Sequence, residues 1–486
     1  MASSDSETLS GRFLIASCII LFILLLLRPR RKLPSNSPQL VGEVWPIVGA
    51  IRFFTARWDF HRENAHRSAT GNFSYYVGRL PVIGLNGDES RKVFYNTKGL
   101  GLMEGYMGLF AAAPTDLKQG VSRTMIEGKE VHGFGQLMSN ITNAKALDSL
   151  LPHLLVDMRK SMDMLSQRQT RVVEPFESIY RVVFQFSMRA IGVEDIADSP
   201  DKLDTARKLF DVLEASSSIA TIVFPKVPSF TMLKRAWAGT RLNSMLNRII
   251  RDRVKTGKRG HDPLQLLIDQ EYETDRIRHT VINAVFAAKS NTPFNAAWLL
   301  VHLAKSPIWL SRVLDEVECA VRKHSRDTSL PLADQLSQIP LQAWESEFPV
   351  IEACLRETVR FHVHGMAFRR NISGGDIPIG SSGEIIPEGA YVTYHPADIH
   401  LDPQTYKNPK EWDPARFAGA RDEDKQSPLG FVGWGTGRSP CIAFWVATFD
   451  FELVDRQGNS MDVPKPDPNM LFTKKPVGIF FDCSRK

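Results

Sequence analysis

The chain has 486 residues, of which 43% are hydrophobic and 23% charged, so it can bury a large core and is neither disordered nor collagen-like. Lys and Arg number 60 and Asp and Glu 54, and the resulting net charge of +6 is too small at this length to indicate nucleic-acid binding. The five cysteines lie far apart, which excludes a CxxC metal motif and the disulfide framework of a small secreted protein.

The first predicted element is an uninterrupted apolar helix at residues 13–27 (FLIASCIILFILLLL). At about 1.5 Å per residue it is roughly 22 Å long, close to the thickness that a membrane span requires. Arg12 alone precedes it and the basic sequence RPRRK follows it, so the positive-inside rule places residues 1–12 in the lumen and the body in the cytosol. No small-residue cleavage site follows, so we expect an uncleaved single-pass anchor and not a signal peptide.

Residues 28–49 form a basic, proline-containing tether, and residues 50–486 are predicted to form a single domain without internal repeats. Apolar residues recur with the helical period at 144–165, 201–215, 232–255, 276–304, 309–323 and 349–360. Strands bounded by Gly or Pro are predicted at 79–85, 370–379 and 383–394. These elements predict a mainly helical fold with small β-sheets, and no glycine-rich nucleotide loop is present.

The most informative segment is 431–443 (FVGWGTGRSPCIA). Its alternating glycines allow the backbone to approach a flat ligand closely, and Pro440 stiffens the chain before Cys441. A cysteine that opens a helix receives backbone N–H donors and the positive end of the helix dipole, and both stabilise a thiolate. Such a thiolate is suited to axial ligation of haem iron. Taken alone, the pattern is also typical of a loop that carries a buried thiol.

This segment resembles the haem-binding loop of the cytochrome P450 family, Phe-x-x-Gly-x-Arg-x-Cys-x-Gly. Gly437 matches the family glycine, and Trp434 stands at the position of the phenylalanine. Arg438 lies one residue from the position of the arginine that helps to hold a haem propionate. The helix after Cys441 is much shorter than in the family, because AFWVATFDFELVD resembles the end of that helix and the strand beyond it. Either the shortened helix is tolerated or the chain is a defective relative.

A second pair of motifs resembles the same family. Glu357 and Arg360 match its Glu-x-x-Arg helix, and their i,i+3 spacing places both charges on one helix face. The sequence WDPARF resembles a family segment that would bring Arg416 to this pair. A buried cluster of this kind must be fully hydrogen-bonded to offset its desolvation, so we expect it to lock the loop that leads to Cys441.

The resemblance extends to the oxygen-activating helix of the family, at residues 287–292 (AAKSNT). In that family Thr292 would donate to bound oxygen or order a proton-carrying water, and Asn291 stands in place of the usual acid. Pro293 lacks an N–H and crowds the carbonyl of Lys289, so we expect a local opening of the helix there. The Asn-Thr-Pro sequence is similar to the sterol 7α-hydroxylase and prostacyclin synthase branch and its fungal relatives.

Other candidate residues are less specific. Arg369 and Arg370 lie where the family has a propionate-binding arginine, and the resemblance does not choose between them. The family's early Trp-x-x-x-Arg helix is not recognisable around residues 120–140. His362 and His364 alternate as metal ligands can, but no third ligand is evident, so the sequence favours ordinary histidines.

The resemblance covers nearly the whole chain after residue 34 and implies a membrane-anchored haem-thiolate monooxygenase with the helical cytochrome P450 fold. It implies haem b with Cys441 as the axial iron ligand, and an NADPH–cytochrome P450 reductase as electron donor. We expect residence in the endoplasmic reticulum membrane, contact with membrane lipid, no nucleic-acid partner, and an apolar substrate such as a sterol, terpenoid or lipid-like secondary metabolite. Two alternatives remain: a haem-thiolate isomerase or dehydratase that needs no O₂, and a catalytically defective, haem-poor relative.

Overall fold

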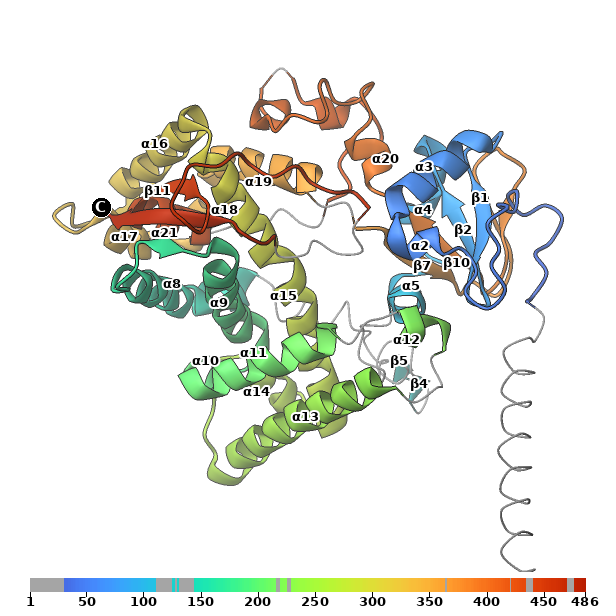
Figure 1. Ribbon diagram of the computed structural model, residues 1–486. Coiled ribbons are helices and arrows are strands. Elements are labelled where there is room, and N and C mark those ends of the chain that lie inside the picture. Colours follow the sequence, from blue (N-terminus) through green and yellow to red (C-terminus); the bar gives the residue numbers. More distant parts are fainter. Residues whose placement is uncertain are drawn as a thin grey trace, which may run out of the picture. The chain divides into compact units, whose positions relative to one another are not determined.

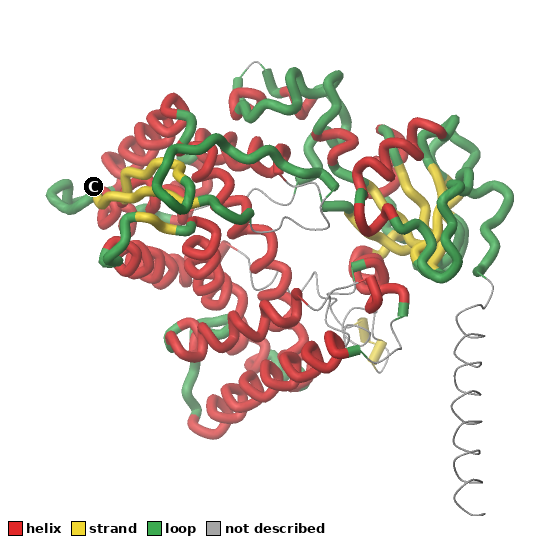
Figure 2. The backbone as a smooth tube through the Cα atoms, viewed as in Figure 1, coloured by secondary structure: helices red, strands yellow, loops and turns green. Residues whose placement is uncertain are grey.

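The computed structural model describes residues 30–110, 125–126, 129–130, 144–215, 219–224, 229–362, 365–419, 421–433, 440–469 and 476–486 (Figure 1). Their contacts divide the chain into two compact units that alternate along the sequence. Unit 1 comprises Met1–Ala111, Ser218–Val227 and Met366–His395, and unit 2 comprises Ala112–Ser217, Pro228–Gly365 and Pro396–Lys486. Helices make up most of unit 2, and the largest sheet belongs to unit 1 (Figure 2).

The sheet of unit 1 has the strand order β1, β2, β10, β7, β3. These strands are β1 (Phe73–Val77), β2 (Leu80–Leu85), β3 (Leu100–Gly101), β7 (Ala367–Asn371) and β10 (Tyr391–Tyr394). Neighbouring strands are antiparallel except β2 and β10, which are parallel with Tyr391 opposite Val82. Gly78, with a φ of +60°, makes the tight turn between β1 and β2. A small hairpin pairs β8 (Ile377–Pro378) with β9 (Ile385–Ile386).

Aromatic side chains form the core of unit 1. Phe53, Phe60, Tyr75 and Phe368 are buried together between the sheet and the helices. The helices of this unit are α2 (Arg52–Thr55), α3 (Arg57–Arg67), α4 (Asp88–Asn96), α5 (Leu102–Leu109) and α12 (Ile219–Val223). The polar sequence of α3, RWDFHRENAHR, buries Arg57 and has too few apolar residues for its period to be recognised from the sequence.

Unit 2 is built around α15 (Thr274–Ala304), which runs through it from end to end (Figure 1). The other helices of this unit are α8 (Ala144–Ser166), α9 (Pro175–Ser187), η1 (Met188–Gly192), α10 (Glu194–Ala197), α11 (Pro200–Ala215), α13 (Phe230–Thr256), α14 (Pro263–Asp269), α16 (Pro307–His324), α17 (Leu332–Gln335), η2 (Leu336–Gln338), α18 (Leu341–Ser346), α19 (Pro349–His362), α20 (Ala397–His400), η3 (Pro414–Phe417), η4 (Glu423–Lys425) and α21 (Pro440–Thr448). Its main apolar cluster gathers side chains of α8, α9, α15, α16, α19 and α21.

Two small sheets complete unit 2. One has β11 (Phe449–Val454) and β6 (Val172–Val173) on either side of β12 (Phe480–Arg485), all antiparallel, and the other pairs β4 (Met125–Ile126) with β5 (Lys129–Glu130). Phe451 and Phe481 of the first sheet are buried in the main apolar cluster. Because β11 follows α21 without a loop, this sheet fixes the carboxyl end of α21.

The six helices that periodicity predicts are confirmed with small shifts at their ends. Local signals explain some of those ends: Ser229 caps α13 by accepting from the Met232 N–H at 3.2 Å, and Gly257 ends it with a φ of +70°. The predicted strands at 370–379 and 383–394 each prove to be two strands, because turns with positive φ at Gly374 and Gly389 interrupt them.

Among the described residues, no helix is both long enough and apolar enough to cross a membrane. The predicted anchor at residues 13–27 lies outside the described residues. The second half of the predicted tether packs on the sheet of unit 1, where the Val41 N–H donates to the Ser74 carbonyl at 2.9 Å. This part of the tether is therefore a component of unit 1.

Candidate active site

Glu357, Arg360 and Arg416 form a buried ion-pair network in unit 2. Arg360 on α19 donates through Nε and Nη2 to the two carboxylate oxygens of Glu357, each at 2.7 Å. Arg416 in η3 donates through Nε to Glu357 Oε1 at 3.1 Å and through Nη1 to Glu423 at 2.9 Å. The three predicted residues are at most 1% exposed, so these charges are compensated within the network and not by water.

The other N–H groups of the two arginines hold the backbone of the segment before η3. Arg360 Nη1 donates to the carbonyls of His400 and Pro409, at 2.6 and 2.8 Å. Arg416 Nη2 donates to the carbonyl of Asn408 at 2.9 Å. The structure therefore joins the three residues of the two sequence motifs, and the joined side chains fix the path of the chain toward Gly433.

After this network the chain approaches α19 too closely for a side chain at Gly433. A Cβ there would lie 2.4 Å from the ring of Phe431 and 2.5 Å from Val359 Cγ1. The glycine at this position is thus required by protein packing, and no ligand is needed to explain it. The next predicted site residues, Trp434, Gly437 and Arg438, lie outside the described residues.

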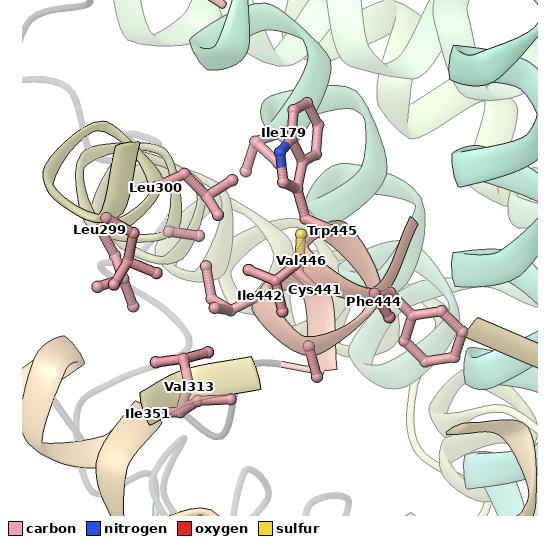
Figure 3. Close-up of a cluster of buried hydrophobic side chains, with 14 of the residues drawn as sticks. Ile179, Leu299, Leu300, Val313, Ile351, Cys441, Ile442, Phe444, Trp445 and Val446 are labelled. Atoms are coloured by element: carbon pink, nitrogen blue, oxygen red, sulfur yellow. The ribbon is translucent and has the colours of Figure 1, made fainter. Parts of the chain in front are cut away.

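Cys441 lies in the first turn of α21, and its side chain is 3% exposed. Figure 3 shows its sulfur among the side chains of Leu300, Ile442 and Trp445, within the main apolar cluster. Burial in these surroundings raises the pKa of the Cys441 thiol to about 12. The described surroundings therefore favour a neutral thiol, whereas the sequence predicts a thiolate.

The short α21 limits where Cys441 can lie. β11 begins at Phe449 and is fixed by pairing with β12, with Phe449 opposite Arg485. At about 1.5 Å per residue, Cys441 is only ~12 Å of helix from that fixed point. The short helix therefore holds Cys441 beside α9 and α15, where Ile179 and Leu300 pack in the same cluster.

Thr292 and Asn291 lie in the middle of α15. The Thr292 side chain is exposed, and the side chain of Asn291 lies outside the described residues. α15 continues through Pro293 as one helix, so the predicted local opening is not visible as an interruption.

Lys289, one turn before Thr292, is a charged residue whose role the sequence did not indicate. Its side chain is 1% exposed, and its ammonium group contacts Asp211 at 3.0 Å and Glu214 at 2.8 Å, both on α11. Tyr180 of α9 donates to the same carboxylate of Asp211 at 2.5 Å. This cluster ties three helices together beside the predicted oxygen-activating segment.

Comparison with known proteins decides the family. The family model for cytochrome P450 matches residues 40–450 of the chain. The chain belongs to the cytochrome P450 family. It is 29% identical to the cytochrome P450 monooxygenase AacuE of Aspergillus aculeatus, over 92% of this chain and 93% of that protein. It is 30% identical to the cytochrome P450 monooxygenase nsrP of Aspergillus novofumigatus, over 94% of this chain and 90% of that protein.

The fold agrees with this assignment. The solved structure of the retinoic-acid-bound cyanobacterial CYP120A1 is similar to the cytochrome P450 chain described here, with a TM-score of 0.68 and 17% sequence identity. The likeness covers 94% of this chain and 100% of that structure. The predicted mainly helical cytochrome P450 fold with small sheets is therefore confirmed, and the family is one of haem enzymes.

The two predicted propionate-binding arginines lie on β7 of unit 1 and point to opposite faces, as successive strand residues do. Arg369 Nη1 donates to the Leu100 carbonyl at 2.8 Å, and its Nε is buried without a hydrogen-bond partner. Burial lowers the pKa of Arg369. Arg370 Nε donates to the Gly389 carbonyl at 3.2 Å, and its guanidinium stacks on Tyr391. Arg369 is therefore the better candidate for holding an anionic group.

The residues of this cytochrome P450 fit haem in part. The partnerless Nε of Arg369 suits a propionate oxygen, and the buried network around Glu357 holds the segment before the predicted haem loop. The sulfur of Cys441 lies in the apolar cluster of unit 2 and is 3% exposed among the described residues, so this position by itself does not present the thiol to a ligand. The nine-residue α21 leads directly into the paired strand β11, and this limits how far Cys441 can lie from that strand.

His302 and His362 form a buried pair, and nothing in the sequence indicated that they would meet. His302 Nε2 on α15 lies 2.7 Å from His362 Nε2 on α19, so the two rings share one proton between them. The ring of His362 stacks on that of Trp298 with 3.9 Å between the ring centroids, and the ring of His302 stacks on that of Trp412 with 4.6 Å between the centroids. His364 lies outside the described residues, and those that are described contain no group of three or more possible metal ligands. In this structure His362 is a packing and hydrogen-bonding residue.

Because His302 is buried, we expect the free energy of unfolding to fall in mild acid. Burial lowers the pKa of His302 to about 3, below the ordinary value near 6.5, so its contribution is complete above pH 6.5 and is lost as the pH falls toward 3. Between pH 7.5 and 5.0 the loss should be about 2 kcal/mol. Urea unfolding of His302→Gln should show a pH dependence weaker by that amount, and His153→Gln on the exposed face of α8 should not. Equal pH dependence in wild type and His302→Gln would contradict the assignment.

Proposed function

We propose that this cytochrome P450 is a haem-thiolate monooxygenase that oxidises an apolar small molecule, of the sterol, terpenoid or lipid-like secondary-metabolite class, using O₂. The family match over residues 40–450 and the fungal relatives named as monooxygenases support this function. The observation that carries it within the structure is the fully hydrogen-bonded network of Glu357, Arg360 and Arg416. Burying such a network costs desolvation free energy, which indicates that the segment it holds must keep one conformation.

We further propose that residues 13–27 anchor the protein in the endoplasmic reticulum membrane with its catalytic part in the cytosol. The apolar run and the basic residues after it support this orientation. An NADPH–cytochrome P450 reductase in the same membrane would then supply electrons, and contact with the lipid would favour apolar substrates. Fusion of a glycosylation-site tag before residue 1 tests the orientation: a glycosylated tag supports it, and an unmodified tag contradicts it.

The test of the function is the difference spectrum of the reduced, CO-treated protein, purified in detergent as the full chain. We expect a strongly red-shifted Soret band in the wild type and its loss in Cys441→Ala. Lys323→Ala, at an exposed site on α16, serves as the matched control and should keep the band. A wild-type protein that folds but gives no such band would contradict the proposed function. If the band is present, NADPH consumption with a reductase separates a monooxygenase from an isomerase, which should consume none.

A second candidate function is favoured by one observation. The burial of Cys441 supports a haem-poor, non-catalytic relative, because a thiol inside the apolar core of unit 2 is withheld from iron. The two candidates differ in haem content: a monooxygenase should purify with haem bound, and the haem-poor relative should purify without it. No observation in the described residues favours the isomerase, and the retained Thr292 suits O₂ chemistry.

A further inference from the structure

Arg57 of unit 1 is a buried arginine without an acidic partner. It opens α3, and its side chain is 0% exposed. Its Nε donates to the Phe53 carbonyl at 2.7 Å, but both Nη1 and Nη2 are buried without any hydrogen-bond partner. Four N–H bonds of one guanidinium group are thus unused inside the protein.

This situation is exceptional in the described part of the chain. Every other buried Arg or Lys there forms an ion pair with a carboxylate: Arg91, Arg189, Arg253, Lys289, Arg360 and Arg416. Burying an unpaired charge costs several kcal/mol, which is why buried charges are normally paired. Arg57 therefore carries a cost that no described contact offsets.

The surroundings of Arg57 are aromatic. Its Cζ lies 4.4 Å from the ring centre of Phe53 and 5.4 Å from that of Phe368. Such stacking attracts the cation through its flat faces but leaves the N–H groups, which point outward in the plane of the guanidinium, unsatisfied. The neighbouring hydroxyl of Tyr75 is hydrogen-bonded to Thr393 at 3.0 Å. The site thus combines apolar walls with a donor pair that needs an external acceptor.

The charge itself persists at neutral pH. Burial lowers the pKa of Arg57 to about 9, so the guanidinium remains protonated near pH 7. The cluster reaches the edge of unit 1 along α5, where Tyr106 and Phe110 are only half-buried. These two half-buried aromatic rings belong to the same cluster as Phe53 and Phe368, which contact the guanidinium.

We propose that the Nη1 and Nη2 groups of Arg57 bind the carboxylate of an otherwise apolar molecule. The planar guanidinium presents paired N–H groups that match the two oxygens of a carboxylate. Phe53, Phe368 and Tyr106 would contact the apolar part of the same molecule. Because this narrows the apolar substrate of the proposed function to an apolar acid, its catalytic meaning rests on that function, but the binding itself does not.

Equilibrium dialysis of the full chain with dodecanoate and with methyl dodecanoate tests the proposal. We expect the wild type to bind dodecanoate at least about tenfold more tightly than the ester, which corresponds to ~1.4 kcal/mol. Arg57→Met should lose this preference and still bind the ester. Arg57→Lys keeps the positive charge but lacks the paired N–H groups of the guanidinium, so it should retain part of the preference. Arg62→Met, whose exposed guanidinium pairs with Asp59 on the same helix, is the matched control and should bind both ligands as the wild type does.

Urea unfolding of the ligand-free variants separates a binding role from a structural one. If Arg57 is kept for a ligand, Arg57→Met should unfold at a urea concentration no lower than the wild type, because an unpaired buried charge has been removed. Dodecanoate should then raise the unfolding midpoint of the wild type and not that of Arg57→Met. Equal dodecanoate affinity in wild type and Arg57→Met would overturn the proposal. A missing CO-difference band would refute the monooxygenase function alone, since dialysis does not depend on haem.

Discussion

Replacing Glu357 by glutamine is expected to lower the free energy of unfolding by about 3 to 5 kcal/mol, because it leaves Arg360 and Arg416 buried with one fewer negative charge. Glu357 accepts hydrogen bonds from both arginines and from the Asp413 N–H at 2.8 Å. A neutral amide can accept only some of these bonds, and its NH₂ group faces further donors. Urea unfolding followed by circular dichroism measures the change.

The matched control for this prediction is Glu318→Gln on α16. Glu318 pairs with Arg322 at 3.6 Å, but both side chains are at least half exposed, so its loss should change the free energy of unfolding by no more than about 0.5 kcal/mol. A similar small effect for Glu357→Gln would show that the buried network does not hold the fold. Reduced protection of the amide hydrogens between η3 and Gly433 in Glu357→Gln would show in addition that the network fixes this segment.

The sequence contained enough information for the network, because its members carry strong local signals. The i,i+3 spacing of Glu357 and Arg360 places them on one face of a helix, and the resemblance supplied the distant Arg416. The amphipathic helices α8, α16 and α19 were likewise predictable, since each shows the helical period. Features that depend on a local sequence pattern are therefore found in the structure as the sequence predicts them.

Features that depend on which elements meet were not predictable. His302 and His362 lie on different helices, and only the packing of α15 against α19 brings their rings together. Arg57 belongs to a polar helix, where an arginine is normally expected at the surface, and its burial follows from the aromatic cluster around it. No single-sequence pattern distinguishes a buried, unpaired arginine from a solvated one.

The position of Cys441 shows the same limit most clearly. The motif before it and the helix after it predicted a thiol at the start of a helix, where the dipole would favour a thiolate. The pairing of β11 with β12 instead determines where the short α21 lies, and that places the sulfur in the core. The position of Cys441 depends on where the short α21 is held by this strand pairing, and no local sequence pattern indicates that position.

Labelling of Cys441 with a thiol-specific maleimide is expected to be at least a thousandfold slower than that of Cys319 in the native protein. Cys319 is exposed, whereas Cys441 is 3% exposed and its pKa is raised to about 12 by burial. A pKa about three units above that of a free thiol reduces the thiolate fraction at neutral pH by about a thousandfold, and the core must also open before the reagent can enter. Mass spectrometry of peptides after timed quenching measures both rates in one sample.

Lengthening α21 tests whether its shortness is the cause. About seven helix-forming residues inserted after Ile442 would add two turns, ~10 Å, between Cys441 and the fixed start of β11. We expect labelling of Cys441 to accelerate toward the rate of Cys319 in the haem-free protein, and the haem content to rise. Addition of haem should then protect Cys441 again, and the same insertion in Cys441→Ala should not gain haem. Unchanged labelling after insertion would show that packing against α9 and α15, and not the length of α21, holds the thiol in the core.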